Sequence, residues 1–184
     1  MPRLFVALRP PPAVRDTLLA TTSGVPGARW QIDAQLHLTL CFVGEIDTRA
    51  ADDLAAALEG IHAPAPVIQL AGTGRFEHRG RTEALWAGVA PHDPLAALHR
   101  KVDAACIRAG LPPERRAYLP HITLARLPRS AGSGQAIDRW LADTATLTSA
   151  RFACTHLILY DSHLAHEGAE YEPVWRWPLA APSA

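Results

Sequence analysis

Two short stretches, His37-Leu38-Thr39-Leu40 and His121-Ile122-Thr123-Leu124, repeat the pattern histidine, apolar residue, threonine, apolar residue. This alternation is typical of a β-strand with one buried face, because successive side chains of a strand point to opposite sides. The pattern predicts that the apolar residues face a core, while both histidines and both threonines lie on the other face of a sheet. Two imidazoles and two hydroxyls are suited to acid–base catalysis. We therefore expect two related half-sites, one on each strand.

The chain has 184 residues, of which 48% are hydrophobic and 20% charged. These values allow one domain, residues 1–184, made of two small lobes. Basic and acidic residues number 18 each, so the net charge is zero. A neutral chain disfavours a broad nonspecific grip on long nucleic acid, which requires a basic face, but allows a small anionic ligand held by a few arginines. Three cysteines without Cys-x-x-Cys spacing disfavour a disulfide framework.

The first apolar run, Leu4 to Leu8, is too short for the core of a signal peptide or for a membrane span. No other segment approaches the needed length. We therefore expect a soluble, cytoplasmic protein without membrane contact. The sequence shows no obvious partner helix, so a monomer is the expectation.

Helix and strand patterns alternate irregularly along the chain. Helices are predicted after Pro10–Pro12, after an Asp47 N-cap, after Asp93-Pro94 and around 137–141. Strand patterns occupy 4–8, 30–32, 37–40, 67–70, 85–89, 121–124, 152–160 and 172–179, and the prolines of the last favour a sheet edge. Without regular βαβ repeats, this order favours an α+β fold with antiparallel sheets. Two helix-and-sheet units, each with one motif strand, would set the histidines across a cleft.

Longer segments around the motifs resemble a known family. They are Arg3–Leu8, His37–Glu45, Leu85–Val89, Pro120–Arg126 and Gly168–Tyr171, which together extend over nearly the whole chain. With the paired motifs in this order, the chain resembles the two-histidine (2H) phosphoesterases and, more closely, the bacterial and archaeal RNA 2′,3′-cyclic phosphodiesterases, also called 2′-5′ RNA ligases. The resemblance implies a bilobal α+β fold of two mainly antiparallel sheets with flanking helices, pseudo-twofold symmetry and an active-site cleft between the lobes.

The same resemblance implies hydrolysis of an RNA 2′,3′-cyclic phosphate to a 2′-phosphate, without a metal ion or other cofactor, and reverse 2′-5′ ligation as a side activity. It makes His37 the proton donor and His121 the proton acceptor, roles that the symmetry of the motifs does not separate. The chemistry requires two such groups, because the attacking water loses a proton while the leaving oxygen, on the opposite side of phosphorus, gains one. Thr39 and Thr123 share the faces of their histidines and can donate hydrogen bonds to the nonbridging oxygens.

Other residues near the motifs are candidates for contact with the substrate. Arg126 is a candidate for a phosphate contact, although the alternation of a regular strand points it away from the motif histidine. Phe42 and Tyr118 are candidates for stacking on a base, with core packing as the alternative. Cys41 has the parity of the first histidine and so suggests a cysteine nucleophile, against the commoner role of a small buried thiol.

Three other functions fit parts of this pattern. A cyclic phosphodiesterase for another small substrate, such as ADP-ribose 1″,2″-cyclic phosphate, would use the same motifs, which contact only the phosphate. A noncatalytic module that binds RNA ends or nucleotides would keep the fold, but it has no need of a matched acid and base. A metal-dependent hydrolase is disfavoured because no carboxylates accompany the motifs.

Overall fold

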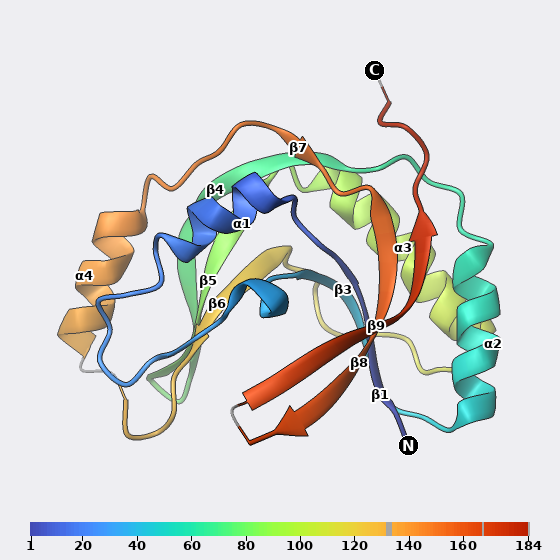
Figure 1. The fold of residues 1–184 in the computed structure, drawn as a ribbon, viewed down its shortest axis with the longest axis horizontal. Helices are drawn as coiled ribbons and strands as arrows, with labels where there is room; N and C mark the ends of the chain where they lie inside the picture. Colours follow the sequence, from blue (N-terminus) through green and yellow to red (C-terminus); the bar gives the residue numbers. More distant parts are fainter. Residues whose placement is uncertain (132–133, 167, 184) are drawn as a thin grey trace.

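The computed structural model describes residues 1–131, 134–166 and 168–183. It has an α+β architecture in which helices flank one curled sheet (Figure 1). Within the described residues the helices are α1 (Pro12–Leu19), α2 (Thr48–Glu59), α3 (Asp93–Arg108), α4 (Gly134–Thr144) and the short 3₁₀ helix η1 (Asp33–Gln35). The four predicted helices are therefore confirmed.

Every pair of neighbouring strands in the sheet is antiparallel. The strands are β1 (Arg3–Leu8), β2 (Arg29–Trp30), β3 (Leu38–Glu45), β4 (Val67–His78), β5 (Arg81–Ala90), β6 (His121–Arg126), β7 (Phe152–Ala153), β8 (His156–Ala165) and β9 (Gly168–Pro178). Their order is β7-β4-β5-β6-β3-β1-β8-β9, and the short β2 also pairs with β6. The predicted antiparallel α+β fold is confirmed, with β9 at an edge.

The sheet consists of two halves that meet at the motif strands. Leu38 of β3 lies opposite Ile122 of β6, and within the described residues this pair joins the half β7-β4-β5-β6 to the half β3-β1-β8-β9. Both residues hold the second position of their motif, so the antiparallel pair relates the two motifs by a local twofold axis. The strands form one continuous sheet rather than the two sheets that the family resemblance implies.

The starts of α2 and α3 reflect their local sequence. The side chain of Asp47 accepts a 2.8 Å hydrogen bond from the backbone N–H of Ala50 and caps α2 as predicted. At α3 the cap position is His92 rather than the expected Asp93, which instead places its negative charge in the first turn, where the helix dipole favours it. This helix ends just before Gly110, whose φ of +84° costs a glycine no strain.

Two strand predictions differ from the structure. The predicted strands 67–70 and 85–89 are parts of a longer hairpin, β4–β5, whose turn contains Arg79 and Gly80, with φ of 51° and 74°. Positive φ at both positions is the requirement of a type I′ turn. The predicted strand 152–160 is interrupted, because β7 pairs with β4 in one half of the sheet while β8 pairs with β1 in the other.

The main core contains side chains from both halves of the sheet and from all four helices. The apolar motif residues are at most 2% exposed and lie in this core: Leu38, Leu40, Ile122 and Leu124. A smaller apolar cluster lies on the opposite face of the sheet and consists of Phe5, Ala7, Ile158 and Tyr160. We call this opposite face, which also carries the motif histidines, the inner face.

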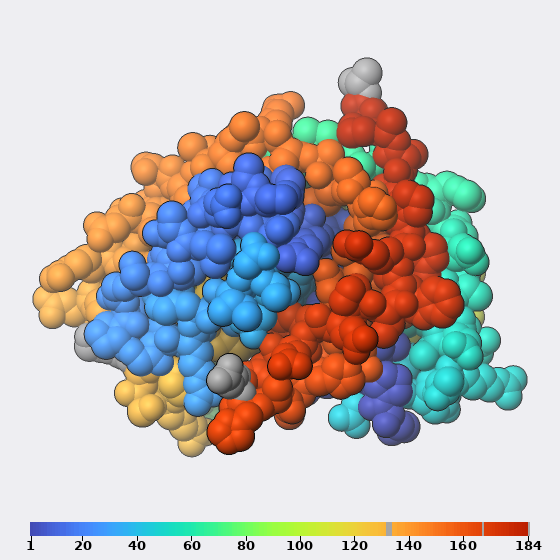
Figure 2. All heavy atoms as spheres, viewed as in Figure 1, coloured from blue at the N-terminus to red at the C-terminus, as the bar shows by residue number. Residues whose placement is uncertain are grey.

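Beside the first motif, η1 and the β8–β9 hairpin lie side by side across the middle of the molecule (Figure 2). Nε2 of Gln35, in η1, donates a 2.7 Å hydrogen bond to the carbonyl of Ala169, in β9. This bond ties the segment that precedes the first motif to the far edge of the sheet. Among the described residues, no helix has the length and apolar character needed to cross a membrane.

Candidate active site

The two motifs bring their histidines and threonines together on the inner face. Extended by one residue in each direction, the register of the Leu38–Ile122 pair sets His37 against Thr123 and His121 against Thr39. The two histidines are then diagonal neighbours, which lie about 7–8 Å apart in an antiparallel pair. All four motif side chains are half-buried. The arrangement therefore gathers two imidazoles and two hydroxyls on one face of the sheet.

Each histidine makes the same hydrogen bond to the backbone. Nδ1 of His37 lies 2.7 Å from the carbonyl oxygen of Gln35, and Nδ1 of His121 lies 2.7 Å from that of Leu119. In both cases the acceptor is two residues earlier in the chain. A carbonyl only accepts, so each Nδ1 carries the proton, and each neutral ring presents an unprotonated Nε2. The sequence pattern did not indicate these two carbonyls, because a backbone acceptor leaves no residue-type signal.

Aromatic rings surround both imidazoles. The ring centroid of His37 lies 4.8 Å from that of Phe5 and 5.1 Å from that of Tyr171. The centroid of His121 lies 4.8 Å from that of Phe76, on β4. These rings come from β1, β9 and β4, and their proximity to the motifs depends on the order of the strands rather than on any local pattern. They restrict the contact of both imidazoles with water.

A fourth ring, Trp86 of β5, lies opposite Thr123 and 6.1 Å from the His121 ring. Its indole covers Gly74 on β4, where an added Cβ would come within 2.3 Å of the ring. A glycine is therefore required at position 74 because the Trp86 indole occupies the space that a Cβ would need, and not because of the backbone angles. This close approach fixes the position of the indole beside the second histidine.

The surroundings of the imidazoles disfavour their charged forms. Burial lowers the pKa of His37 to about 4, although its backbone hydrogen bond opposes the change. Burial also lowers the pKa of His121. The positive charge of Arg126 acts in the same direction on both rings. Both histidines are consequently neutral at pH 7, and both Nε2 atoms are able to accept a proton.

A β-bulge follows the first motif and reverses the alternation of β3. Pairing with β1 omits Leu40, so that Cys41 lies opposite Val6 and Phe42 opposite Phe5. One extra residue turns the next side chain to the other face. Cys41 therefore points into the core, and Phe42, which is 64% exposed, lies on the inner face. The parity that suggested Cys41 as a nucleophile is wrong, and so is the alternative of core packing for Phe42.

The side chain of Cys41 contacts a second thiol within the core. Its Sγ lies 3.6 Å from the Sγ of Cys106, on α3, and both side chains are buried. The hydrogen bond to this second thiol and burial both raise the pKa of Cys41. A buried thiol with a raised pKa is a poor nucleophile.

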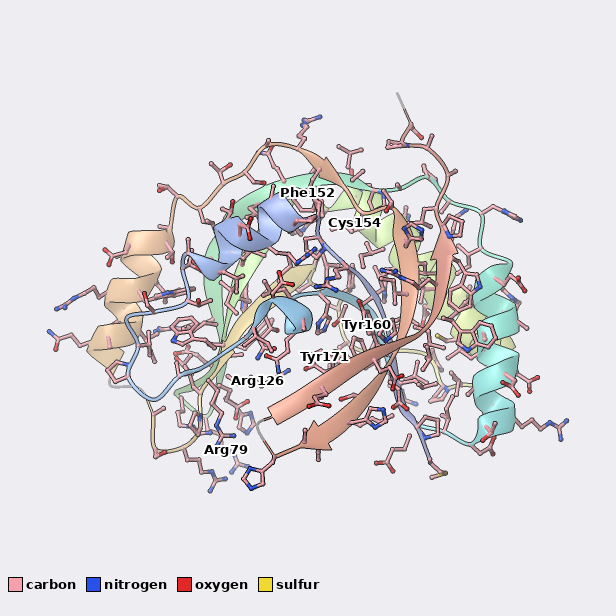
Figure 3. All side chains as sticks on the ribbon, viewed as in Figure 1. Arg79, Arg126, Phe152, Cys154, Tyr160 and Tyr171 are labelled. Carbon is pink, nitrogen blue, oxygen red and sulfur yellow. The ribbon has the colours of Figure 1, made fainter. Side chains whose placement is uncertain are left out.

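The second motif is followed by the same bulge. Pairing with β5 omits Leu124, so that Ala125 enters the core and Arg126 lies opposite Ala84 on the inner face. A regular strand would have pointed Arg126 away from the histidines, and the bulge corrects that expectation. Figure 3 shows Arg126 on the β6 side of the inner face and Tyr171 on the side of the β8–β9 hairpin. Arg126 and Phe42 are thus equivalent positions, each five residues after its histidine.

Tyr118 has a different environment from the other candidates. Its ring stacks on His99 of α3, with centroids 4.2 Å apart and planes 7° from parallel. Its hydroxyl donates a 3.2 Å hydrogen bond to the carbonyl of Thr39. One ring face and the hydroxyl are therefore engaged in packing α3 against the first motif strand, and we give Tyr118 no part in substrate binding. In the described part of the chain, no group of three or more histidine, cysteine or carboxylate side chains is placed to hold a metal ion.

Comparisons with known proteins agree with this geometry. A family model described as the 2′-5′ RNA ligase superfamily matches residues 10–165. The chain is 27% identical over 169 residues to the RNA 2′,3′-cyclic phosphodiesterase of Aeropyrum pernix, covering 91% of this chain and 94% of that protein. It is 28% identical to the protein of that name from Escherichia coli, over 96% of both chains.

Two further comparisons concern length and fold. The chain is 30% identical over 161 residues to the RNA 2′,3′-cyclic phosphodiesterase of Geobacillus stearothermophilus, but covers only 50% of that protein's length. The crystal structure of E. coli LigT complexed with 3′-AMP superposes with a TM-score of 0.75 at 25% identity, covering 97% of this chain and 98% of that one.

Proposed function

Because the chain belongs to the 2′-5′ RNA ligase superfamily, we propose that it hydrolyses 2′,3′-cyclic phosphodiester ends of RNA to 2′-phosphates. The observation that carries this proposal is the pair of neutral imidazoles on the inner face, related by the local twofold axis, whose Nε2 atoms form no hydrogen bond with the described residues. Relatives that match nearly the full length of this chain are named for this activity. Without those names, the geometry alone supports acid–base chemistry on a small anion.

In the proposed reaction a water molecule attacks phosphorus and loses its proton to Nε2 of one histidine. The bond between phosphorus and O3′ breaks, and the other histidine, protonated at Nε2, donates its proton to O3′. The placement of the two imidazoles on either side of the phosphate site suits an in-line displacement. Thr39 and Thr123 donate hydrogen bonds to the nonbridging oxygens, where charge accumulates.

Arg126 is the proposed cationic contact of the reacting phosphate. It lies on the inner face of the strand that carries His121, and its charge lowers the pKa of both imidazoles. A guanidinium also suits two phosphate oxygens at once. A bound phosphate anion would oppose the effects of burial and of Arg126, and so would favour protonation of one histidine. The bound substrate thereby favours the protonated form of the histidine that acts as the acid.

The assignment of His37 as acid and His121 as base rests on family resemblance. Burial opposes protonation strongly at His37, so an acid role depends on the substrate anion. A 4-nitrophenyl phosphodiester distinguishes the two roles, because its leaving group needs no proton. Replacement of the acid by alanine should cost much less activity on this substrate than on a cyclic phosphate, whereas replacement of the base should cost the same on both. A smaller loss for His121→Ala than for His37→Ala on the activated substrate would reverse the assignment.

Phe42 is the proposed stacking surface for the terminal base. It is exposed on the inner face, with its ring centroid 6.3 Å from that of Phe5, which itself contacts His37. An exposed aromatic ring next to a phosphate site suits stacking on any base. Phe42→Ala should therefore raise KM for cyclic nucleotides more than it lowers kcat.

The test of the function is a pair of incubations, one with and one without EDTA, with a dinucleotide that ends in a 2′,3′-cyclic phosphate. We expect hydrolysis and a 2′-phosphate product, identified by chromatography against 2′- and 3′-phosphate standards. Loss of activity with EDTA would contradict the metal-independent mechanism, and a 3′-phosphate would contradict the predicted direction of ring opening. Absence of turnover would favour a binding module or a different cyclic phosphate. A test of ligation requires an RNA with a 2′,3′-cyclic phosphate end together with an RNA that has a 5′-hydroxyl, and not the 2′-phosphate product.

The proposal includes action in the cytoplasm, where RNA ends are produced, and a monomeric enzyme. The local twofold axis relates two motifs of the same chain, so one chain supplies both histidines. Size-exclusion chromatography with light scattering tests the monomer, and activity that disappears on dilution would contradict it.

A further inference from the structure

Strand pairing places a second arginine beside Arg126. Arg29 of β2 lies directly opposite Arg126 of β6, and the next residue, Trp30, lies opposite the core residue Ala125. Residues directly opposite in an antiparallel pair point to the same face. Because the bulge at Leu124 turns Arg126 onto the inner face, Arg29 lies on that face as well.

This pair is electrostatically unfavourable without a ligand. Like charges directly opposite each other in a sheet reduce stability. Within the described ranges, neither guanidinium forms an ion pair or a side-chain hydrogen bond, whereas Arg9, Arg15, Arg75 and Arg81 each have a carboxylate partner. Both side chains are exposed on the inner face. A bound anion between them would offset the repulsion.

The position of Arg29 relative to the histidines limits which anion it meets. Along β6 the order is His121, Thr123, then Arg126, and Arg29 lies directly opposite Arg126 on β2, so both arginines lie beyond the motif along the strand. A mononucleotide cyclic phosphate has a single phosphate, which the histidines and Arg126 hold. A second phosphate of the same molecule would have to lie farther along the strand, as the next phosphodiester of an RNA chain does.

We propose that Arg29, side by side with Arg126, binds the phosphodiester adjacent to the cyclic end, so that an oligonucleotide is preferred over a mononucleotide. This inference rests on the proposed function. The inference adds to that function a second phosphate subsite and a substrate of at least two nucleotides. The local twofold axis provides no counterpart, because Phe42 holds the position equivalent to Arg126. The added positive charge therefore lies on one side of the site only and gives the RNA a direction.

The test compares kcat/KM for adenosine 2′,3′-cyclic phosphate with kcat/KM for the ApA dinucleotide that ends in the same cyclic phosphate. Arg29→Gln removes the charge and keeps a polar side chain. We expect the ratio of the two values, dinucleotide over mononucleotide, to fall by about tenfold, the loss typical of one hydrogen bond to a charged group. Arg100→Gln, which changes an exposed arginine of α3, is the matched control and should leave the ratio unchanged.

Two further readouts separate binding from a structural role. The melting temperature of Arg29→Gln should stay level or rise, because the substitution removes a repulsion. The salt dependence of kcat/KM for the dinucleotide should also become shallower. An unchanged ratio in Arg29→Gln, or an equal loss on both substrates, would overturn the inference alone. Failure of the wild-type protein to hydrolyse either substrate would instead overturn the proposed function, and this inference with it.

Discussion

Replacement of His37 should remove a specific part of the pH dependence of stability. Burial holds the pKa of His37 at about 4 in the folded protein, against an ordinary value of 6.5. Below pH 6.5 the unfolded chain therefore binds a proton that the folded protein does not. The free energy of unfolding then falls as the pH falls, starting near pH 6.5 and continuing to about pH 4. At about 1.4 kcal/mol for each pH unit, the complete loss is about 3 kcal/mol, of which about 2 kcal/mol has occurred at pH 5.

The assay is urea unfolding, followed by circular dichroism, at pH 7.5 and at pH 5.0. His37→Asn keeps an amide N–H for the Gln35 carbonyl but no longer titrates. Between the two pH values the wild-type protein should lose about 2 kcal/mol more stability than this variant does. The contribution of His121 is present in both proteins and cancels. His78→Asn, at an exposed position at the end of β4, is the matched control and should follow the wild type.

An equal pH dependence in the wild type and His37→Asn would refute the reasoning. It would mean that His37 accepts a proton in the folded protein as readily as in water. The account of the site as two neutral imidazoles would then be wrong, and so would the need for the substrate anion to charge the acid. A change in absolute stability that is the same at both pH values would not bear on this point.

Three other substitutions test separate parts of the site. Arg126→Gln should lower kcat/KM by about tenfold on the mononucleotide and on the dinucleotide alike. NMR titration of this variant should show higher pKa values for both histidines, because a nearby positive charge is removed. Unchanged titration curves would show that Arg126 does not act on the histidines. Gly74→Ala should destabilise the protein by about 1–3 kcal/mol in urea unfolding, because the new methyl group collides with the Trp86 indole, and a stability equal to wild type would show that the indole moves freely. Cys41→Ala should keep kcat within about twofold but lower the stability, because the thiol packs against Cys106 in the core. A loss of activity in a folded Cys41→Ala variant would instead support Cys41 as a nucleophile.

Much of the site could be predicted from the sequence because the motifs combine a local period with a specific chemistry. The alternation in each motif correctly placed Leu38, Leu40, Ile122 and Leu124 in the core. It also indicated strands on which histidine and threonine share a face. The helices could be predicted equally well, because their caps and apolar spacing are local signals, as the Asp47 cap of α2 illustrates.

Predictions failed where the outcome depended on the partner strand. Cys41 and Arg126 both follow a bulge, and each was assigned to a face by an alternation that the bulge reverses. A bulge is a mismatch between two strands, so neither strand contains it alone. The break between β7 and β8 has a similar origin, because the chain moves there from one half of the sheet to the other.

The sequence by itself determined the two motif strands, their buried faces and the acid–base character of the site. Those properties follow from side-chain type and a period of two, which act within a few residues. Only the tertiary structure decided that Leu38 meets Ile122, that Arg126 joins the histidines, and that Arg29 lies beside it. These are relations between segments far apart in the chain, set by register, and a shift of one residue in register exchanges the faces of a strand. The two short motifs therefore supply the acid–base groups of the candidate site, while the pairing of β2, β3 and β6 decides which charges surround them.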